Sequence, residues 1–136
     1  MAGEGYSGTP LLKKLGIKPE MKILLLNPPH DYFELLEADI TDQFFLKVNT
    51  PDFIHLFAKN LTAFKAGMKK VLPLCKTNSS IIIWVSWYKK STGIITDLTE
   101  DMIRDYALQN DLVDIKVCAV SNEWSGLKLV VPVAKR

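Results

Sequence analysis

The sequence predicts a three-layer α/β domain, in which helices cover both faces of a mostly parallel sheet and an antiparallel hairpin completes it. Continuous apolar runs at 21–26 and 81–85 are typical of strands that are buried on both faces, as parallel sheets require. Segments with apolar residues at helical spacing separate the predicted strands. Two further strand-like segments follow the last of these helices around a short polar turn.

Length and composition set the broad class of the protein. A chain of 136 residues with 48% hydrophobic content fits one folded domain. We expect that domain at 9–136, after a flexible Gly-rich tail at 1–8. No apolar run approaches the roughly 18 residues of a membrane span, and residues 1–14 lack the apolar stretch of a signal peptide. These features predict a cytoplasmic protein with no membrane partner.

The first predicted helix and strand have clear boundaries. Thr9 and Pro10 are typical of a helix start, and Gly16 is typical of a helix end. A strand at 21–26 must stop at Asn27-Pro28-Pro29, because proline cannot donate to a sheet.

A short helix is expected next, at 30–37, followed by strands at 44–48 and 52–58. Only residues 49–51 separate these two strands, which is too short for a crossover between neighbouring parallel strands. Their relation in the sheet therefore stays open.

The central part of the chain predicts a long helix and the strongest strand. Asn60 or Thr62 is expected to cap the helix. Its buried stripe is predicted to contain Phe64, Met68, Val71 and Cys75. The strand at 80–87 follows, rich in isoleucine.

The remaining elements are a helix and a hairpin. Asp97, with Glu100 three residues later, resembles a capping box. The buried stripe of this helix is predicted at Met102, Ile103, Tyr106 and Ala107. Strands at 115–120 and 127–133 enclose the turn 122–126 and are expected to pair antiparallel.

This order of elements is typical of an open Rossmann-like sheet. The closing antiparallel pair also matches the second half of the methyltransferase fold. A likeness of fold alone implies no activity.

Candidate ligand-binding residues follow from the rule that open α/β sheets bind ligands beyond the carboxyl ends of their strands. They are Asn27, His30, Ser86, Trp87, Lys89, Lys90 and Trp124. We expect a shallow pocket in which Trp87 and Trp124 stack on an aromatic ligand while Lys89 and Lys90 hold an anion. The competing interpretation is that Trp87 covers the top of the sheet and that the lysines are only solvated.

His30 is the candidate for acid–base catalysis, because it follows a strand end beside Asp31. No nucleophile can be assigned beside it. The other histidine, His55, alternates with phenylalanines in a predicted strand and is interpreted as a core residue. Asn27-Pro28-Pro29 resembles the Asn-Pro-Pro-aromatic motif of amino-methyltransferases. Two features oppose that interpretation: His30 takes the aromatic position, and no glycine loop precedes the motif.

Several ligand classes find little support. Cys75 and Cys118 are too few for a disulfide scaffold and have no metal-ligand spacing, so no metal is predicted, and no cofactor signature is present. Nucleic acid is an unlikely partner, because Arg104 and Arg136 are the only arginines. The pI near 8.5 is also modest for a nucleic-acid-binding protein.

Charge is distributed in blocks. From Phe53 to Thr96 the chain has seven lysines and no acidic residue, and acidic stretches lie on either side. These blocks predict either the solvated faces of separate helices or a positive face opposite negative ones, which attracts an anion or lets copies of the chain associate.

Three stretches together are similar to one bacterial family. They are Gly5-Tyr6-Ser7-Gly8-Thr9-Pro10-Leu11 with Lys14-Leu15-Gly16, the segment 84–90 continuing to 96–101, and the segment 112–120 running into 123–129. The chain resembles the small bacterial proteins grouped as domain of unknown function 3052. It differs at Tyr88, where proline is expected, which affects the loop that carries Lys89 and Lys90. The resemblance implies an organisation and no activity.

The leading expectation is a non-catalytic or regulatory module that binds a small anionic or aromatic ligand, or a protein partner. One alternative is an enzyme, either a degenerate methyltransferase dependent on S-adenosylmethionine or one that uses His30. A structural homo-oligomer is the other.

Overall fold

The computed structural model of the protein describes residues 10–37, 44–45 and 50–136. The predicted tail at 1–8, the cap at Thr9 and most of the strand predicted at 44–48 lie outside these ranges. The elements are α1 (Leu11–Leu15), β1 (Ile23–Leu26), α2 (Tyr32–Leu36), β2 (Phe44–Phe45), β3 (Phe53–Phe57), α3 (Leu61–Cys75), β4 (Ile82–Tyr88), α4 (Glu100–Gln109), β5 (Val113–Ala119) and β6 (Trp124–Val130).

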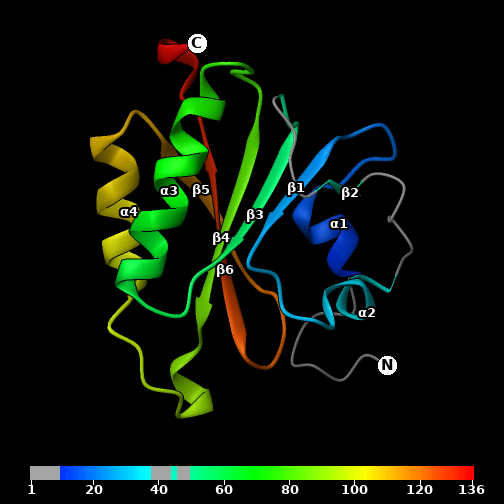
Figure 1. The fold of residues 1–136 in the computed structure, drawn as a ribbon, viewed down its shortest axis with the longest axis vertical. Coiled ribbons are helices and arrows are strands. Elements are labelled where there is room, and N and C mark those ends of the chain that lie inside the picture. The colour runs from blue at the N-terminus through cyan, green and yellow to red at the C-terminus, as the bar shows by residue number, and fades with distance from the viewer. Residues whose placement is uncertain (1–9, 38–43, 46–49) are drawn as a thin grey trace.

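The described strands form one mixed sheet in the order β2-β1-β3-β4-β6-β5 (Figure 1). β1 pairs in parallel with β2 on one side and with β3 on the other, and β3 pairs in parallel with β4. β6 is antiparallel to both β4 and β5. β1 thus separates β2 from β3, so the two are not neighbours. Phe44 and Phe53 both pair with Ile23, so the two-residue β2 lies at the level where β3 begins and no return along a full strand is needed. The chain has the Rossmann-like α/β fold that the sequence predicts.

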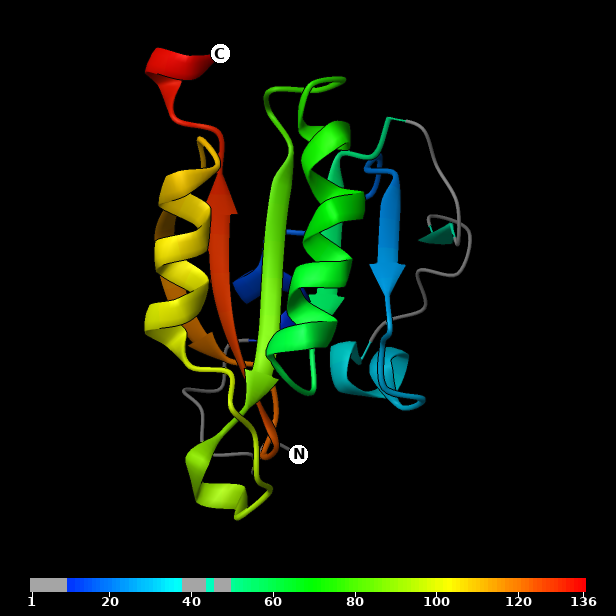
Figure 2. The ribbon, with the colours of Figure 1, turned by 60° about the vertical axis from the view of Figure 1, so that its left-hand side comes forward.

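Helices cover both faces of the sheet and enclose two separate cores. The long helices α3 and α4 lie side by side on one face, and α1 and α2 cover the other (Figure 2). The side chains of β3 alternate between them: Ile54 and Leu56 pack under α3 and α4, whereas Phe53 and Phe57 pack toward α1 and α2. This alternation decides which side of the sheet each predicted site residue faces.

Two helix boundaries follow from local chemistry. α1 ends at Gly16, whose φ of 80° is left-handed and favours glycine. α3 begins after Asn60, whose side-chain oxygen accepts a hydrogen bond from the Ala63 N–H at 2.8 Å, as one of the two predicted caps requires.

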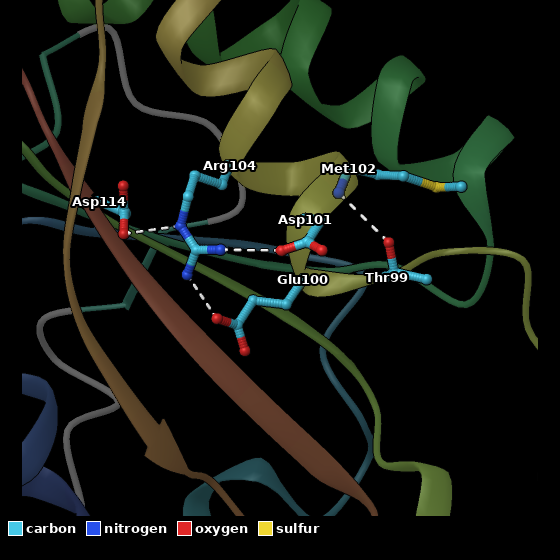
Figure 3. A network of polar contacts seen from close by, with 6 residues as sticks. All are labelled: Thr99, Glu100, Asp101, Met102, Arg104 and Asp114. Carbon is cyan, nitrogen blue, oxygen red and sulfur yellow. Dashed lines mark hydrogen bonds and ion pairs between the residues drawn. The ribbon is translucent and has the colours of Figure 1, made fainter.

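The predicted cap of α4 is wrong. Thr99 caps this helix, accepting a hydrogen bond from the Met102 N–H (Figure 3). The Asp97 carboxylate instead accepts a hydrogen bond of 2.8 Å from the Leu61 N–H, at the start of α3. Asp97 therefore ties the loop before α4 to the neighbouring helix, a contact across 36 residues of sequence.

On the side of α4 that faces β5, Arg104 joins three carboxylates (Figure 3). It donates to Glu100, to Asp101 at 3.0 Å and to Asp114 at 3.0 Å. The hydrogen bond to Glu100 is the largest cause of a raised Arg104 pKa. Of the predicted stripe, Ile103 and Ala107 are buried, but Met102 is 40% exposed.

The hairpin also differs from its predicted bounds. β6 begins at Trp124 rather than at 127, and β5 ends at Ala119, so residues 120–123 make the turn. In the described part of the chain, no helix has the length and apolar character needed to cross a membrane.

Candidate functional site

The strand order reverses between β1 and β3, because the chain leaves β1 toward β2 and leaves β3 toward β4. Loops that follow two such strands diverge and leave a crevice, where Rossmann-like sheets bind ligands. A hollow of about 710 Å³ opens at this point, which we call the switch-point hollow. Its lining residues are Asn27, Pro28, Pro29, His30, Asp31, Phe57, Lys59, Asn60, Ala63, Tyr88, Glu123 and Trp124.

One wall of the switch-point hollow is the turn after β1. Asn27 has a φ of 56°, in the left-handed region that asparagine tolerates better than most residues. Pro28 and Pro29 follow and have no N–H to donate. His30 is exposed at the rim. The turn therefore presents side chains to the hollow, whereas a glycine loop would present its N–H groups.

The opposite wall is aromatic. Trp124, the first residue of β6, lies opposite Tyr88 in the sheet register, and their rings stack with centroids 4.3 Å apart. The Trp124 ring also meets the edge of Phe57 at 5.0 Å. Phe57 and Trp124 are almost fully buried, whereas Tyr88 is half-buried. Tyr88 therefore offers the accessible ring of this wall.

Charged side chains of both signs surround the opening. Lys59 is exposed at the end of β3, immediately before the cap of α3. Asp31 and Glu123 lie on the remaining sides. With one lysine against two carboxylates, the rim suits a ligand of low net charge better than a polyphosphate.

Trp87, Lys89 and Lys90 line a different hollow, of about 740 Å³, between the end of β4 and the start of α4. Trp87 packs with the core under α3 and α4, whereas Trp124 packs with the core on the α1 and α2 side. The expectation that both tryptophans stack on one ligand is therefore wrong. Trp124 aligns with Tyr88, one residue beyond Trp87, and adjacent residues of a strand face opposite sides.

Ser86 belongs to neither hollow. It has no exposed surface, and its hydroxyl lies 2.7 Å from Nε2 of His55. The Tyr32 hydroxyl lies 2.8 Å from Nδ1 of the same ring. Desolvation lowers the His55 pKa to about 3. The prediction that His55 is a core residue is confirmed, and Ser86 as a ligand contact is corrected: its hydroxyl is used inside the protein.

The hydrogen-bonded series Ser86–His55–Tyr32 has the order of a nucleophile, a base and an orienting group. A substrate cannot reach these groups, because Ser86 and His55 are both 0% exposed and Phe57 stacks on the His55 ring at 4.2 Å. A neutral, enclosed imidazole satisfies the polar groups of three elements and so stabilises the fold. Within the described ranges, no group of three His, Cys, Asp or Glu side chains is placed to hold a metal.

The structure thus brings together Asn27, His30 and Trp124 from the predicted set, and it adds Phe57, Lys59 and Tyr88. Lys59 and Tyr88 each stand at the carboxyl end of a strand, so the positional rule covers them. Phe57 could not be found that way, because its place beside Trp124 depends on the packing of β3 against β4 and β6.

Comparisons with known proteins bear on the fold alone. The chain matches no family model and no curated protein. It is similar to the structure of an uncharacterised protein from Listeria monocytogenes serotype 4b, with a TM-score of 0.57 and 12% identity over 91% of this chain and 67% of that one. A protein in the NADB-Rossmann superfamily from Streptococcus agalactiae aligns with a TM-score of 0.49 and 10% identity over 96% of this chain and 71% of that one. The resemblance to domain of unknown function 3052 stays a prediction.

Proposed function

We propose that the protein is a non-catalytic binding module that holds a small ligand with a planar ring and one anionic group in the switch-point hollow. The observation that carries the proposal is the coincidence of three features: the reversal of strand order, a hollow of about 710 Å³ and an aromatic wall. This volume lies within the range of about 300–1,000 Å³ that small-molecule sites occupy.

Each part of the ligand has a counterpart in the hollow. A planar ring packs against Tyr88, whose ring is already held in place by its stacking on Trp124. The anionic group lies toward Lys59, and the Asn27 side chain supplies an amide for hydrogen bonds. Glu123 and Asp31 repel negative charge beyond what Lys59 balances, which disfavours a polyanion.

The degenerate methyltransferase is the second candidate. It is favoured by the antiparallel β6 beside the parallel strands, an arrangement shared with the methyltransferase-like fold. The turn after β1 opposes it, because Pro28 and Pro29 stand where that fold class approaches its cofactor with glycine N–H groups. His30 would then be the candidate acid or base, although no serine, threonine or cysteine is among the described residues that line the hollow.

A thermal-shift screen of the purified protein tests the proposal. The panel contains nucleosides, nucleoside monophosphates, aromatic carboxylates, nicotinamides, acyl-CoA and S-adenosylhomocysteine. A ligand present at 100 times its dissociation constant stabilises the protein by about 2.7 kcal/mol, which raises the melting temperature by roughly 8–10 °C. A ring-bearing monoanion is expected to give this shift, whereas a response confined to S-adenosylhomocysteine favours the methyltransferase.

Variants locate the ligand. Tyr88→Ala and Lys59→Glu should each weaken binding at least about tenfold, as the loss of a stacked ring or a charge partner predicts. Tyr88 lines both hollows, so the comparison of Lys59 with Lys90 decides between them. Lys90→Glu is the matched control, since Lys90 is an exposed lysine that lines the other hollow. A hit that Lys90→Glu abolishes and Lys59→Glu leaves intact contradicts the assignment, as does a panel without any shift.

A further inference from the structure

The face of the molecule that carries α3 and α4 is divided by charge. Along its 15 residues α3 has three lysines and no acidic residue. Over 10 residues α4 has three acidic residues and one arginine. The two helices lie on the same side of the sheet (Figures 1 and 2) and together line one groove. A basic strip on α3 therefore borders an acidic one on α4.

An apolar groove of about 440 Å³ runs between these strips. Its floor contains the rings of Phe64 and Tyr106, which meet edge to face at 5.2 Å, together with Leu61 and the half-exposed Met102. Lys65 and Lys69 stand along the α3 side, and Asp105 stands along the α4 side. The groove therefore has the apolar centre and charged rim of a protein interface.

The charges beside the groove have few partners within the chain. Among the described residues, the ion pairs join Arg104 to three carboxylates and Lys135 to Asp111, and none involves a lysine of α3 or Asp105. Arg104 points to the opposite side of α4, toward Asp114 on β5 (Figure 3). The basic side chains of α3 and the acidic side chain of α4 are thus free to meet opposite charges on another molecule.

We propose that the occupant of this face is a second copy of the same chain. A twofold axis running along the groove, parallel to the helices, places α3 of one copy over α4 of the other. Lys65 and Lys69 then face the partner's Asp105, and the same contacts repeat on the other side of the axis. The apolar groove floors, with Met102 at their edge, meet at the axis. One divided face is therefore complementary to itself, which a uniformly charged face cannot be.

The size of the surface sets the strength of the association. α3 is about 22 Å long at 1.5 Å per residue, and two helices side by side are about 20 Å wide. A face of these dimensions buries about 440 Å² per copy, or about 880 Å² in all, which is below the roughly 1,200 Å² of stable interfaces and typical of weak, transient ones. The dimer should therefore form reversibly, at high micromolar concentrations, and weaken as salt screens the charge pairs.

Analytical ultracentrifugation of the wild-type protein is the first test. In low salt the weight-average mass should rise with concentration from 15.3 kDa toward twice that value. The apparent dissociation constant should increase roughly tenfold when ionic strength rises from about 0.05 to 0.5 M. A mass that stays at 15.3 kDa up to millimolar protein overturns the proposal.

Charge exchange locates the interface. Variant A carries Lys65→Glu with Lys69→Glu, so that both helices are acidic, and variant B carries Asp105→Lys with Gln109→Lys, so that both are basic. Each variant alone should be monomeric, and an equimolar mixture should form a heterodimer. In one half of it the acidic α3 of A meets the basic α4 of B, and in the other half the unchanged α3 of B meets the unchanged α4 of A.

Lys70→Glu is the control, because Lys70 is an exposed lysine of α3 that does not line the groove. Circular dichroism confirms that the variants are folded. A wild-type dimer that persists in A or B, or an A–B mixture that stays monomeric, shows that this pairing is wrong.

Discussion

The two faces of the sheet are built from different chemistry. Under α3 and α4 the core is mainly aliphatic, with Leu56, Ile83, Val85 and Leu129 fully buried beside the rings of Phe64 and Trp87. Under α1 and α2 it is richer in aromatic rings and contains buried polar groups.

On that second face His55 bridges Tyr32 and Ser86, and the Trp84 indole N–H donates to the Leu15 carbonyl at 2.9 Å. The helices differ correspondingly, since α3 has 15 residues whereas α1 and α2 have five each.

This difference teaches how a sheet can be covered in two ways. Long amphipathic helices bury aliphatic side chains by shape alone. Helices of five residues bury little, so large rings and internal hydrogen bonds complete the layer and define its geometry. The switch-point hollow draws its aromatic wall from the second face. We therefore expect the free energy of unfolding to depend on pH and on polar substitutions at that face. At the aliphatic face we expect it to depend on changes in side-chain volume.

The largest effect is expected from Trp84, which is fully buried on the aromatic face. Trp84→Ala should lower the free energy of unfolding by about 3–5 kcal/mol, measured by urea denaturation. Trp84→Phe keeps much of the ring but leaves the Leu15 carbonyl without its donor, and it should cost about 1–3 kcal/mol. Equal stability of Trp84→Phe and wild type would show that the hydrogen bond contributes nothing.

The second prediction concerns pH. Burial lowers the pKa of His55 from an ordinary 6.5 to about 3. Between these two pH values the unfolded chain binds a proton at His55 and the folded chain does not. Stability should therefore be fully present above pH 6.5 and fall as pH decreases toward 3, by about 2 kcal/mol at about pH 5.

Urea titrations at a series of pH values measure this slope. In His55→Gln, which cannot take up the proton, the slope between about pH 6.5 and 4 should be shallower by nearly one proton. If the pH dependence of stability is the same in His55→Gln as in wild type, a group other than His55 takes up the proton.

Volume should control the aliphatic face, and Gly67 offers the sharpest test. A Cβ at this position would lie 2.5 Å from Cδ1 of Leu56, which is fully buried. The overlap costs about 1–3 kcal/mol and offsets the roughly 1 kcal/mol that alanine gains over glycine in a helix, so Gly67→Ala should destabilise by about 1 kcal/mol.

A double-mutant cycle checks this assignment. The cost of Gly67→Ala should vanish when Leu56→Ala removes the contact, giving a coupling free energy of about 0.5–3 kcal/mol. Ala66→Gly, at the exposed neighbouring position, measures only the difference in helix propensity between alanine and glycine. It should lower the free energy of unfolding by about 1 kcal/mol. Additive effects of Gly67→Ala and Leu56→Ala would show that Leu56 is not the obstacle.

The smallest predicted effect comes from the starts of α3 and α4. Asp97→Ala leaves the Leu61 N–H without its acceptor and should cost about 0.5–1 kcal/mol. Thr99→Ala, which removes the cap of α4, should cost a similar amount. Thermal unfolding measures both. Asp97→Asn, which keeps an oxygen acceptor, should behave as wild type.

Local patterns predicted the elements well, because their causes lie within a few residues. The apolar run at β1, the cap at Asn60 and the glycine at the end of α1 each depend on neighbours in sequence. Asp97 was assigned to the nearest helix for the same reason. Asp97 in fact accepts a hydrogen bond from Leu61, which requires that the starts of α3 and α4 lie close together. No local sequence pattern carries that information.

The candidate site was predicted in part, because strand ends can be found from sequence while the side of the sheet cannot. Asn27, His30 and Trp124 were placed at the correct edge. Trp87 was grouped with Trp124 because both follow strands. The register that aligns Trp124 with Tyr88 instead joins segments 36 residues apart and is set only when the sheet assembles. The position of β2 beyond β1 has the same origin.

The place of β6 has a consequence for synthesis. The ribosome makes β5 before β6, yet β6 lies between β4 and β5 in the sheet. Until Trp124–Val130 has left the exit tunnel, the edge of β4 next to the apolar core has no hydrogen-bonding neighbour. An unpaired apolar strand edge is a template for pairing with other chains. In the nascent chain, one edge of the apolar strand β4 therefore stays unpaired until every strand of the sheet has been translated.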